Sequence, residues 1–176
     1  MSGNPGSWER IDSRRAAREL QAFTCTTSHP RSDAGRKYAH PRPWEWEAQA
    51  YLRDASKRLR PGDLVVVARD QTPAARICAA VWLQFPQADG LEHMFLAAAG
   101  VSLSMRHSGG QLADALMAEA ITTGLRRAER SGMARLLVTG KIHVENRASQ
   151  NMVTRAGFEP LDLGHPYQTW GHLREV

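Results

Sequence analysis

The sequence predicts a single domain of mixed α/β class, in which a mostly antiparallel central sheet contains one parallel β-α-β unit. Its 176 residues, with 42% hydrophobic and 23% charged side chains, suit one globular domain with a sizeable core. Two short apolar runs joined by a polar turn predict an antiparallel hairpin. A third apolar run leads through a glycine turn into a long Ala/Leu-rich segment and then into another apolar run. A strand–helix–strand order of this kind joins parallel strands with a right-handed crossover.

The N-terminal third is predicted to be helical around a long polar loop. Residues 1–9 are rich in Gly, Pro, Ser and Asn, so we expect a flexible tail ahead of a domain over residues 10–176. Asp12 or Ser13 can cap the first helix, whose middle consists of good helix formers. In order, the predicted elements are a helix over 11–23, a polar loop over 24–43 and a helix over 44–59.

Further strands and two more helices are predicted in the rest of the chain. The strands cover 64–67, 77–83, 91–103, 134–139 and 167–173, and the helices cover 111–130 and 147–156. The strand over 91–103 is longer than the usual length of about five or six residues, so it should contain a bulge. The longer helix stops at Ser131-Gly132, and Asn146 can cap the shorter one.

The turn before the long helix has the residue types that bind phosphate. It is Arg106-His107-Ser108-Gly109-Gly110-Gln111. A helix start offers unpaired N–H groups and the positive end of the helix dipole, glycines let an anion approach the backbone, and an arginine adds a planar charged donor. The turn matches neither the G-x-x-x-x-G-K-[ST] nucleotide loop nor the G-x-G-x-x-G dinucleotide fingerprint. The alternative is a strand-to-helix loop that binds no ligand.

This turn resembles the pyrophosphate turn of the GNAT acetyltransferases, whose pattern is Arg/Gln-x-x-Gly-x-Gly/Ala. Val101 stands five residues before the arginine, where that family has a hydrophobic residue, whereas Gln111 replaces a small one. The resemblance implies a GNAT fold and acetyl-CoA as the co-substrate. By the same resemblance, acetyl-CoA would be held by Val101, Ser102, Leu103, Arg106, His107, Ser108, Gly109, Gly110, Gln111, Asn146 and Ser149.

A second stretch, residues 144–158, resembles the segment after the fifth strand of GNAT enzymes. Its matching residues are Asn146, Ala148, Ser149, Gly157 and Phe158. In that family the asparagine contacts the pantetheine or the nearby backbone. A simple helix N-cap is the alternative, and one residue can fill both roles. Many members carry a tyrosine, proposed to protonate the departing thiolate, where this chain has Val153, so another group or water would have to supply that proton.

The resemblance implies direct transfer of the acetyl group to a primary amine of a small molecule or peptide. The thioester carbonyl would meet a backbone N–H near Val101, where the fourth and fifth strands splay apart. An amine with a pKa near 10 needs a base. The candidates are Glu92, His93 and His143, with Glu92 placed first, and each has an alternative role as a surface side chain. Strand parity cannot choose between Glu92 and His93, because neighbours face opposite sides of a sheet.

The acceptor amine is not specified by the sequence. Five aromatic residues lie in the segments that shape selectivity in the GNAT fold, namely Trp44, Trp46, Tyr51, Tyr167 and Trp170. Two roles stay open for them. They can line a pocket for an amine, or they can belong to the core, which is favoured for most of them.

The net charge of +5 is unevenly distributed along the chain. Residues 1–60 hold 12 Lys/Arg and 7 Asp/Glu, whereas residues 61–176 hold 11 of each. The basic excess suits an acidic partner or a nucleic acid, but no nucleic-acid motif accompanies it, so a solvated basic surface is favoured. The alternative functions are an RNA-acting, toxin-like acetyltransferase, suggested only by this excess, and a non-catalytic acyl-CoA sensor, suggested by Val153 and Gln111.

The two cysteines, Cys25 and Cys78, show no metal-ligand spacing, which predicts free thiols, a reducing cytoplasm and no metal site. Cys78 lies in an apolar strand, so Cys25 is the one serious nucleophile if transfer is indirect. No apolar run reaches the roughly 18 residues that span a bilayer, and the first residues lack the basic start and apolar core of a secretory signal. No membrane contact is therefore expected, and both a monomer and a homodimer stay open.

Overall fold

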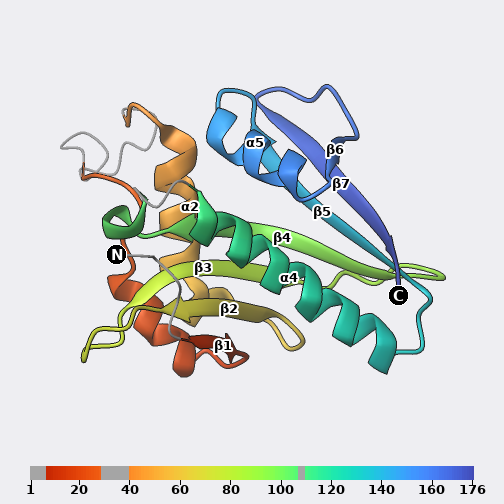
Figure 1. Ribbon diagram of the computed structural model, residues 1–176, viewed down its shortest axis with the longest axis horizontal. Helices are drawn as coiled ribbons and strands as arrows, with labels where there is room; N and C mark the ends of the chain where they lie inside the picture. The colour runs from red at the N-terminus through yellow and green to blue at the C-terminus, as the bar shows by residue number, and fades with distance from the viewer. Residues whose placement is uncertain (1–6, 29–39, 107–109) are drawn as a thin grey trace.

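The computed structural model of this chain describes residues 7–28, 40–106 and 110–176 (Figure 1). Outside these residues lie the first part of the expected tail, the middle of the loop over 24–43, and three cofactor candidates, His107, Ser108 and Gly109. The strands are β1 Ser7–Ile11, β2 Leu64–Arg69, β3 Ile77–Gln84, β4 Glu92–Val101, β5 Arg135–His143, β6 Glu159–Pro160 and β7 Tyr167–Glu175. The α-helices are α2 Pro43–Arg53, α3 Ala55–Arg58, α4 Gln111–Arg130 and α5 Arg147–Arg155, and the 3₁₀ helices are η1 Ala16–Ala22 and η3 Leu103–Met105.

Within the described residues, the seven strands form one sheet in the order β1-β2-β3-β4-β5-β7-β6 (Figure 1). Neighbouring strands are antiparallel except β4 and β5, which run parallel and are connected through α4. This confirms the predicted mixed, mostly antiparallel sheet with one parallel β-α-β unit. The long helix also has the bounds that the sequence predicted.

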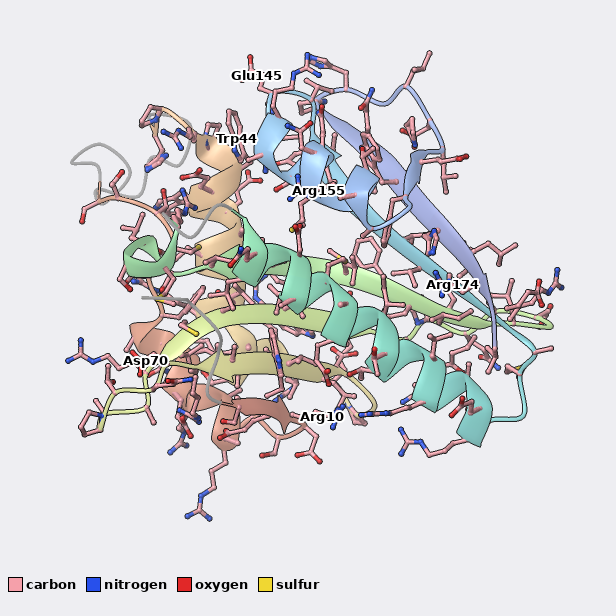
Figure 2. All side chains as sticks on the ribbon, in the orientation of Figure 1. Arg10, Trp44, Asp70, Glu145, Arg155 and Arg174 are labelled. Atoms are coloured by element: carbon pink, nitrogen blue, oxygen red, sulfur yellow. The ribbon has the colours of Figure 1, made fainter. Side chains whose placement is uncertain are left out.

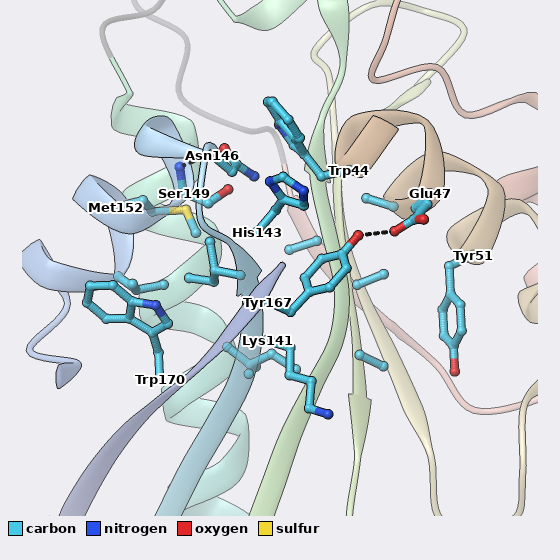
Figure 3. Close-up of a pocket in the computed structure, with 18 of the residues that line it drawn as sticks. Trp44, Glu47, Tyr51, Lys141, His143, Asn146, Ser149, Met152, Tyr167 and Trp170 are labelled. Carbon is cyan, nitrogen blue, oxygen red and sulfur yellow. Dashed lines mark hydrogen bonds between the residues drawn. The ribbon is translucent and has the colours of Figure 1, made fainter. Parts of the chain in front are cut away.

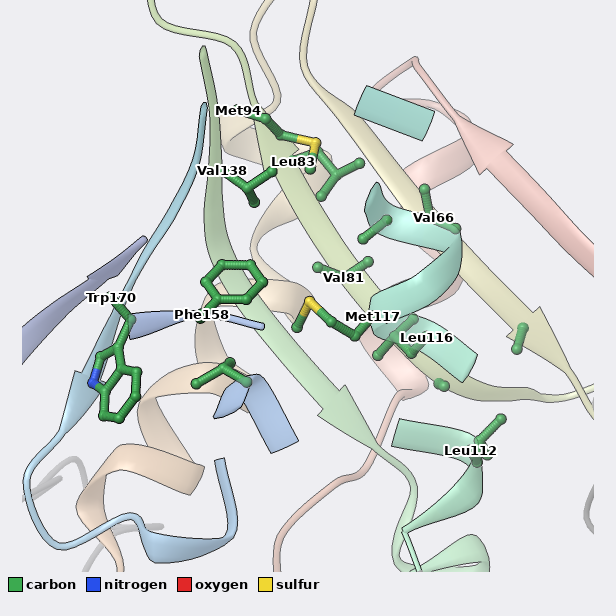
Figure 4. Close-up of a cluster of buried hydrophobic side chains, with 14 of the residues drawn as sticks. Val66, Val81, Leu83, Met94, Leu112, Leu116, Met117, Val138, Phe158 and Trp170 are labelled. Atoms are coloured by element: carbon green, nitrogen blue, oxygen red, sulfur yellow. The ribbon is translucent and has the colours of Figure 1, made fainter. Parts of the chain in front are cut away.

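Helices cover both faces of the sheet and define two apolar clusters. On one face α4 packs over the middle strands, and the cluster beneath it includes Leu112, Leu116, Met117, Val66, Val81, Leu83, Met94, Val138 and Phe158 (Figure 4). α4 lies close to the sheet because Gly124 faces it: a Cβ there would be 2.9 Å from Leu136 Cδ2 and 3.0 Å from Met94 Sδ. On the other face η1, α2 and α3 enclose a second cluster around the fully buried Trp82.

The N-terminal strand departs from the sequence-based prediction. Residues 7–9, expected in a tail, and Ile11, expected to begin a helix, form β1 along the edge of β2. Alternate side chains of a strand point to opposite faces. Trp8 accordingly packs against the cluster under α4, whereas Ile11 joins the cluster on the other face. One short strand thus contributes to both clusters, and the helix that follows is reduced to η1.

The long strand predicted over 91–103 is β4, and it contains the predicted bulge. A register shift opposite Trp82 and Leu83 of β3 leaves Ala97 as an extra residue. Pairing between β4 and β5 stops beside it, at Leu96 and Gly140. Beyond that point β4 pairs with β3 and β5 pairs with β7, so the two parallel strands diverge.

Smaller differences concern the ends of elements. The helix predicted over 44–59 is two helices that meet at Asp54, whose side chain binds Lys57 and Arg58. β5 is longer than predicted because its last residues pair with β7. The short strand β6 was not predicted, since two residues carry no periodicity. Asn146 caps α5 as expected, with its Oδ1 accepting from the Ser149 N–H at 3.2 Å.

Candidate functional site

The divergence of β4 and β5 opens two connected cavities. The first, of about 220 Å³, lies at the gap between the strands, and the second, of about 300 Å³, extends from the gap to the start of α4. They share the lining residues Trp44, Ala48, Ala99, Asn146, Ser149 and Met152. Trp44 stands on the α2 side of the passage and Met152 on the α5 side, so the two cavities form one passage through the sheet (Figure 3).

The second cavity ends at the first turn of α4. Gly110 has φ +86° and occupies the N-cap position, where no described side chain caps the helix. The N–H groups of the first turn of a helix have no acceptor within it, and the helix dipole places partial positive charge there. The end of the cavity therefore offers backbone donors to an anion.

Arg155 adds a positive charge beside this helix start. A Cβ on Gly110 would lie 3.4 Å from Arg155 Nη2, and the same guanidinium donates to both carboxylate oxygens of Asp114 at 2.6–3.2 Å. Arg155 lies at the end of α5 and lines the second cavity (Figure 2). Sequence reasoning missed it, because only the packing of α5 beside α4 brings residue 155 next to residue 110.

Two of the predicted cofactor residues before the phosphate turn use their backbone N–H groups within the fold. The Ser102 N–H donates to the Cys78 carbonyl at 2.8 Å, and the Leu103 N–H donates to the Thr24 carbonyl at 3.2 Å. Ser102 and Leu103 line a separate surface depression next to the β2–β3 hairpin. Gln111 begins α4 and is exposed. Of the predicted cofactor residues within the described ranges, those that line the second cavity are Val101, Arg106, Gly110, Asn146 and Ser149.

Arg106 lines the second cavity but is bound to two other segments. Its Nη1 donates to Glu45 Oε1 at 2.9 Å, and its Nη2 donates to the Cys25 carbonyl. Burial alone would raise the pKa of Glu45, but hydrogen bonds from Arg106, Thr26 and Arg42 outweigh it and hold the pKa of the carboxyl below its ordinary value. Arg106 thus lines the cavity and also links its loop to α2 and to the segment around Cys25.

Cys25 is not poised as a nucleophile. Its side chain is 1% exposed, and burial raises the pKa of its thiol to about 11 despite the positive charge of Arg106. Its sulfur packs tightly on β4, where a Cβ on Gly100 would lie 3.0 Å from it. A thiol with this pKa is almost entirely protonated near neutral pH.

A chamber of aromatic rings and one carboxylate lies on the α2 side of the first cavity (Figure 3). The Trp44 and His143 rings are stacked with centroids 4.6 Å apart, and His143 meets Tyr167 edge to face at 5.2 Å. The Tyr167 hydroxyl donates to the carboxylate of Glu47, one turn along α2 from Trp44. We call these four residues the acceptor chamber. Of them, Glu47 was not singled out by the sequence analysis; its spacing of three from Trp44 was the available signal.

The favoured base, Glu92, lies away from this chamber. Glu92 and His93 pair with the first residues of β5, at the opposite end of the β4–β5 ladder from the gap, and neither lines the passage. Glu92 accepts a 2.7 Å hydrogen bond from Arg127. His93 Nε2 lies 2.8 Å from Thr139 Oγ1, and burial lowers the pKa of the imidazole. The structure therefore brings His143 into the site and leaves Glu92 and His93 out. β4 and β5 separate only beyond the end of their paired region, and Glu92 and His93 lie at its other end.

The α5 side of the first cavity is apolar. Val153 and Phe158 are each 3% exposed and line it together with Trp170. Trp170 Nε1 is buried and, among the described residues, has no hydrogen-bond partner. Trp170 therefore belongs mainly to the core, as the sequence favoured, whereas Trp44 and Tyr167 belong to the chamber.

Two further properties concern the whole of the described chain. None of its helices combines the length and the apolar character that crossing a membrane requires. Over residues 7–28, 40–106 and 110–176, no three His, Cys, Asp or Glu side chains are grouped so as to hold a metal ion.

Comparison with known proteins identifies the fold. No family model matches the sequence, and no curated protein sequence matches it. Solved structures do match over nearly the whole chain. A mutant AtaT toxin bound to acetyl-CoA and the C-terminus of the antitoxin AtaR is 16% identical, with a TM-score of 0.59 over 95% of this chain and 92% of that chain.

Two further matches are of similar quality. PaiA N-acetyltransferase from Thermoplasma acidophilum, in complex with coenzyme A, is 12% identical, with a TM-score of 0.57 over 97% and 99% of the two chains. A GNAT-family acetyltransferase from Listeria monocytogenes is 11% identical, with a TM-score of 0.56 over 98% of each chain. At these identities the likeness shows the fold, which is that of the GNAT acetyltransferases.

Proposed function

We propose that this chain, which has the GNAT fold, transfers an acetyl group from acetyl-CoA directly to a primary amine. The observation that carries the proposal is the passage through the sheet. It joins the start of α4, which no described side chain caps and which Arg155 flanks, to a chamber of aromatic rings and one carboxylate. A bulge in β4 and the end of the β4–β5 ladder create the passage where a continuous sheet would be closed.

The second cavity fits the coenzyme. Gly110 presents no Cβ to the cavity, the first-turn N–H groups of α4 suit a pyrophosphate, and Arg155 lies beside them. Asn146 and Ser149 line both cavities and would support the pantetheine between the phosphates and the gap. Bound acetyl-CoA supplies an activated thioester, and the chain positions it against the acceptor. A phosphate would compete with Glu45 for the guanidinium of Arg106.

Glu47 is the proposed base. An ammonium must lose a proton before its nitrogen can attack a carbonyl. His143 is less suited, because the Glu145 N–H donates to its Nδ1 at 3.2 Å, which leaves the proton of the neutral ring on Nε2. The carboxylate of Glu47 lies in the same chamber, and in its ionised form it can accept a proton from the amine.

Tyr167 is the proposed proton donor to the departing thiolate. Val153 lines the passage from α5 and carries no exchangeable proton. The Tyr167 phenol enters the chamber from β7 and is hydrogen-bonded to Glu47. One side-chain pair can therefore take a proton from the amine and return one to the sulfur, which keeps the proton count balanced over a turnover.

The arginines of the N-terminal third support a small or peptide acceptor over a nucleic acid. Arg10 donates to Glu119 at 2.8 Å, while Arg14 and Arg53 donate to backbone carbonyls at 3.0 and 2.7 Å. These guanidinium groups join segments of the fold, so part of the basic excess has a structural role.

A non-catalytic acyl-CoA sensor would share the site and differ in having no turnover.

The test is a panel of primary amines with acetyl-CoA, followed by release of free thiol. We expect turnover with at least one amine above the hydrolysis seen without acceptor. Tight acetyl-CoA binding with no turnover across the panel would favour the sensor and overturn the enzyme. Steep salt dependence of RNA binding would favour the RNA-acting alternative.

A matched pair of glycine variants tests the coenzyme site. Gly110 and Gly62 have φ of +86° and +89°, so alanine costs a similar strain of about 1 kcal/mol at each. A Cβ at Gly62 would meet nothing within 4 Å. Gly110→Ala should therefore raise the acetyl-CoA Kd about tenfold by calorimetry, whereas Gly62→Ala should leave it unchanged. Equal affinities in the two variants would remove the α4 start from the site.

A further inference from the structure

We propose that the acceptor chamber selects an alkylammonium whose neighbouring carbons bear no carboxylate. This rests on the proposed function and deepens it by naming the class of acceptor. Small alkylamines and lysine side chains both carry such an ammonium. The proposal excludes free α-amino acids as acceptors, because their carboxylate is attached to the carbon next to the nitrogen.

The charge of the chamber favours a cation. Of the described residues that line the first cavity, Glu47 is the one carboxylate, and its position is set by the hydrogen bond from Tyr167. Glu47 and Tyr167 come from α2 and β7, which lie on opposite sides of the gap (Figure 3). A cation that binds beside this hydrogen-bonded pair would meet a carboxylate whose position is fixed before binding, so little side-chain ordering is required.

The rings of the chamber favour the same class. Trp44, His143 and Tyr167 form one continuous wall, with centroid separations of 4.6 and 5.2 Å, and Tyr51 lines the cavity further along α2. The faces of tryptophan and tyrosine attract an ammonium, and their area covers an apolar body. A second carboxylate placed in this chamber would be partly desolvated and would be repelled by the like charge of Glu47.

Lys141 also lines the first cavity, but it does not place its positive charge among the four residues of the acceptor chamber. It is exposed, and its side chain points away from Glu47 (Figure 3). It pairs across the ladder with Thr169, beside Asp162. Hydrogen bonds from Thr169 lower the pKa of the Asp162 carboxyl, and the positive charge of Lys141 adds to this effect. Lys141 thus faces an acidic neighbour outside the chamber.

The proton and electron balance follows from these positions. The bound ammonium gives one proton to Glu47, and its lone pair then forms the N–C bond to the thioester carbonyl. As the C–S bond breaks, the sulfur takes the electron pair and receives a proton from Tyr167. The nitrogen loses its second proton through the same pair, so an amide, a thiol and one released proton result.

The test compares acceptors that differ by one group. Tyramine and free tyrosine share the same ring and amine, and free tyrosine adds the α-carboxylate. We expect kcat/KM for tyramine to exceed that for tyrosine at least 100-fold. Nα-acetyl-lysine amide serves as the lysine arm: turnover on it but not on tyramine assigns the ammonium to a lysine side chain, and the reverse assigns it to a small amine. Equal turnover of tyramine and tyrosine, with both above the hydrolysis seen without acceptor, would overturn the proposal and leave the acetyltransferase function standing.

Binding is measured separately from chemistry with N,N,N-trimethyl-tyramine, a quaternary ammonium that cannot be acetylated. We expect it to bind by calorimetry and to compete with the amine. Glu47→Gln, which keeps an acceptor for Tyr167, should weaken its binding at least tenfold. Glu129→Gln, which removes an exposed carboxylate on α4, serves as the matched control and should not weaken it. Binding without any turnover would support the chamber while the acetyltransferase function fails. No binding, or equal binding to Glu47→Gln, would overturn the chamber.

Discussion

Arg106 donates a 2.9 Å hydrogen bond to Glu45, which joins the loop before α4 to the first turn of α2. Its second terminal nitrogen binds the Cys25 carbonyl, so one guanidinium connects three segments. The residue that resembles a phosphate ligand in the sequence therefore also links the loop that lines the second cavity to α2 and to the segment around Cys25. Binding a phosphate and linking these segments are separate roles, and variants of Arg106 and of Glu45 should affect them differently.

The first prediction separates these roles. Arg106→Ala should weaken acetyl-CoA binding by about 1.5–3 kcal/mol, the scale of a hydrogen bond to a charged group, and should also lower the melting temperature. Glu45→Gln should lower the melting temperature but leave acetyl-CoA affinity equal or higher, because it releases the guanidinium. Calorimetry of both variants provides the comparison. Weaker binding in both to the same degree would make Arg106 purely structural.

The second prediction concerns stability at low pH. The pKa of the Glu45 carboxyl is lower in the folded chain than the ordinary 4.5, since bonds from Arg106, Thr26 and Arg42 outweigh the effect of burial. The stabilisation from Glu45 is therefore complete above about pH 4.5 and is lost as pH falls through the lower folded pKa. Urea unfolding between about pH 3 and 7 should show that wild type loses more stability than Glu45→Gln as the solution is acidified. Parallel curves would mean that the ion pair contributes nothing.

The third prediction is that no acetyl-cysteine forms. With a pKa of about 11, about one Cys25 thiol in 10⁴ is ionised at pH 7. The double variant Cys25→Ala, Cys78→Ala should keep most of its kcat, assayed well below its melting temperature. Double-reciprocal plots with both substrates varied should intersect. Parallel lines, together with an acetylated Cys25 seen by mass spectrometry before amine is added, would establish a covalent intermediate.

The fourth prediction revises what the sequence suggested for the N-terminus. Residues 1–9 were expected to form a flexible tail, but β1 begins at Ser7 and Trp8 packs against the cluster under α4. Deleting residues 1–9 should therefore lower the melting temperature by more than a few degrees. Trp8→Ala should cost about 1–3 kcal/mol, and Trp8→Phe should restore much of that loss. An unchanged melting temperature in Trp8→Ala would show that β1 is peripheral to stability.

Several parts of the fold were predictable because their signals are local. The bounds of α4 follow from a glycine before it and Ser131-Gly132 after it, and the cap of α5 follows from Asn146. The bulge in β4 followed from length alone, since so long a strand seldom stays regular. β1 escaped notice because a five-residue strand shows its alternation only once its partner β2 is known.

By itself, the sequence determined the mixed α/β class, the order of the main elements and the glycine turn at a helix start, because caps, turns and periodicity act between residues close along the chain. Only the tertiary structure decided which groups share the passage. Glu47 meets Tyr167 across 120 positions in the chain, and Arg155 reaches Gly110 because α5 packs beside α4. Glu92, placed first among the bases, lies at the closed end of the β4–β5 ladder. The passage exists where that ladder ends, and the point at which two strands part depends on pairing between distant segments, which no local pattern records.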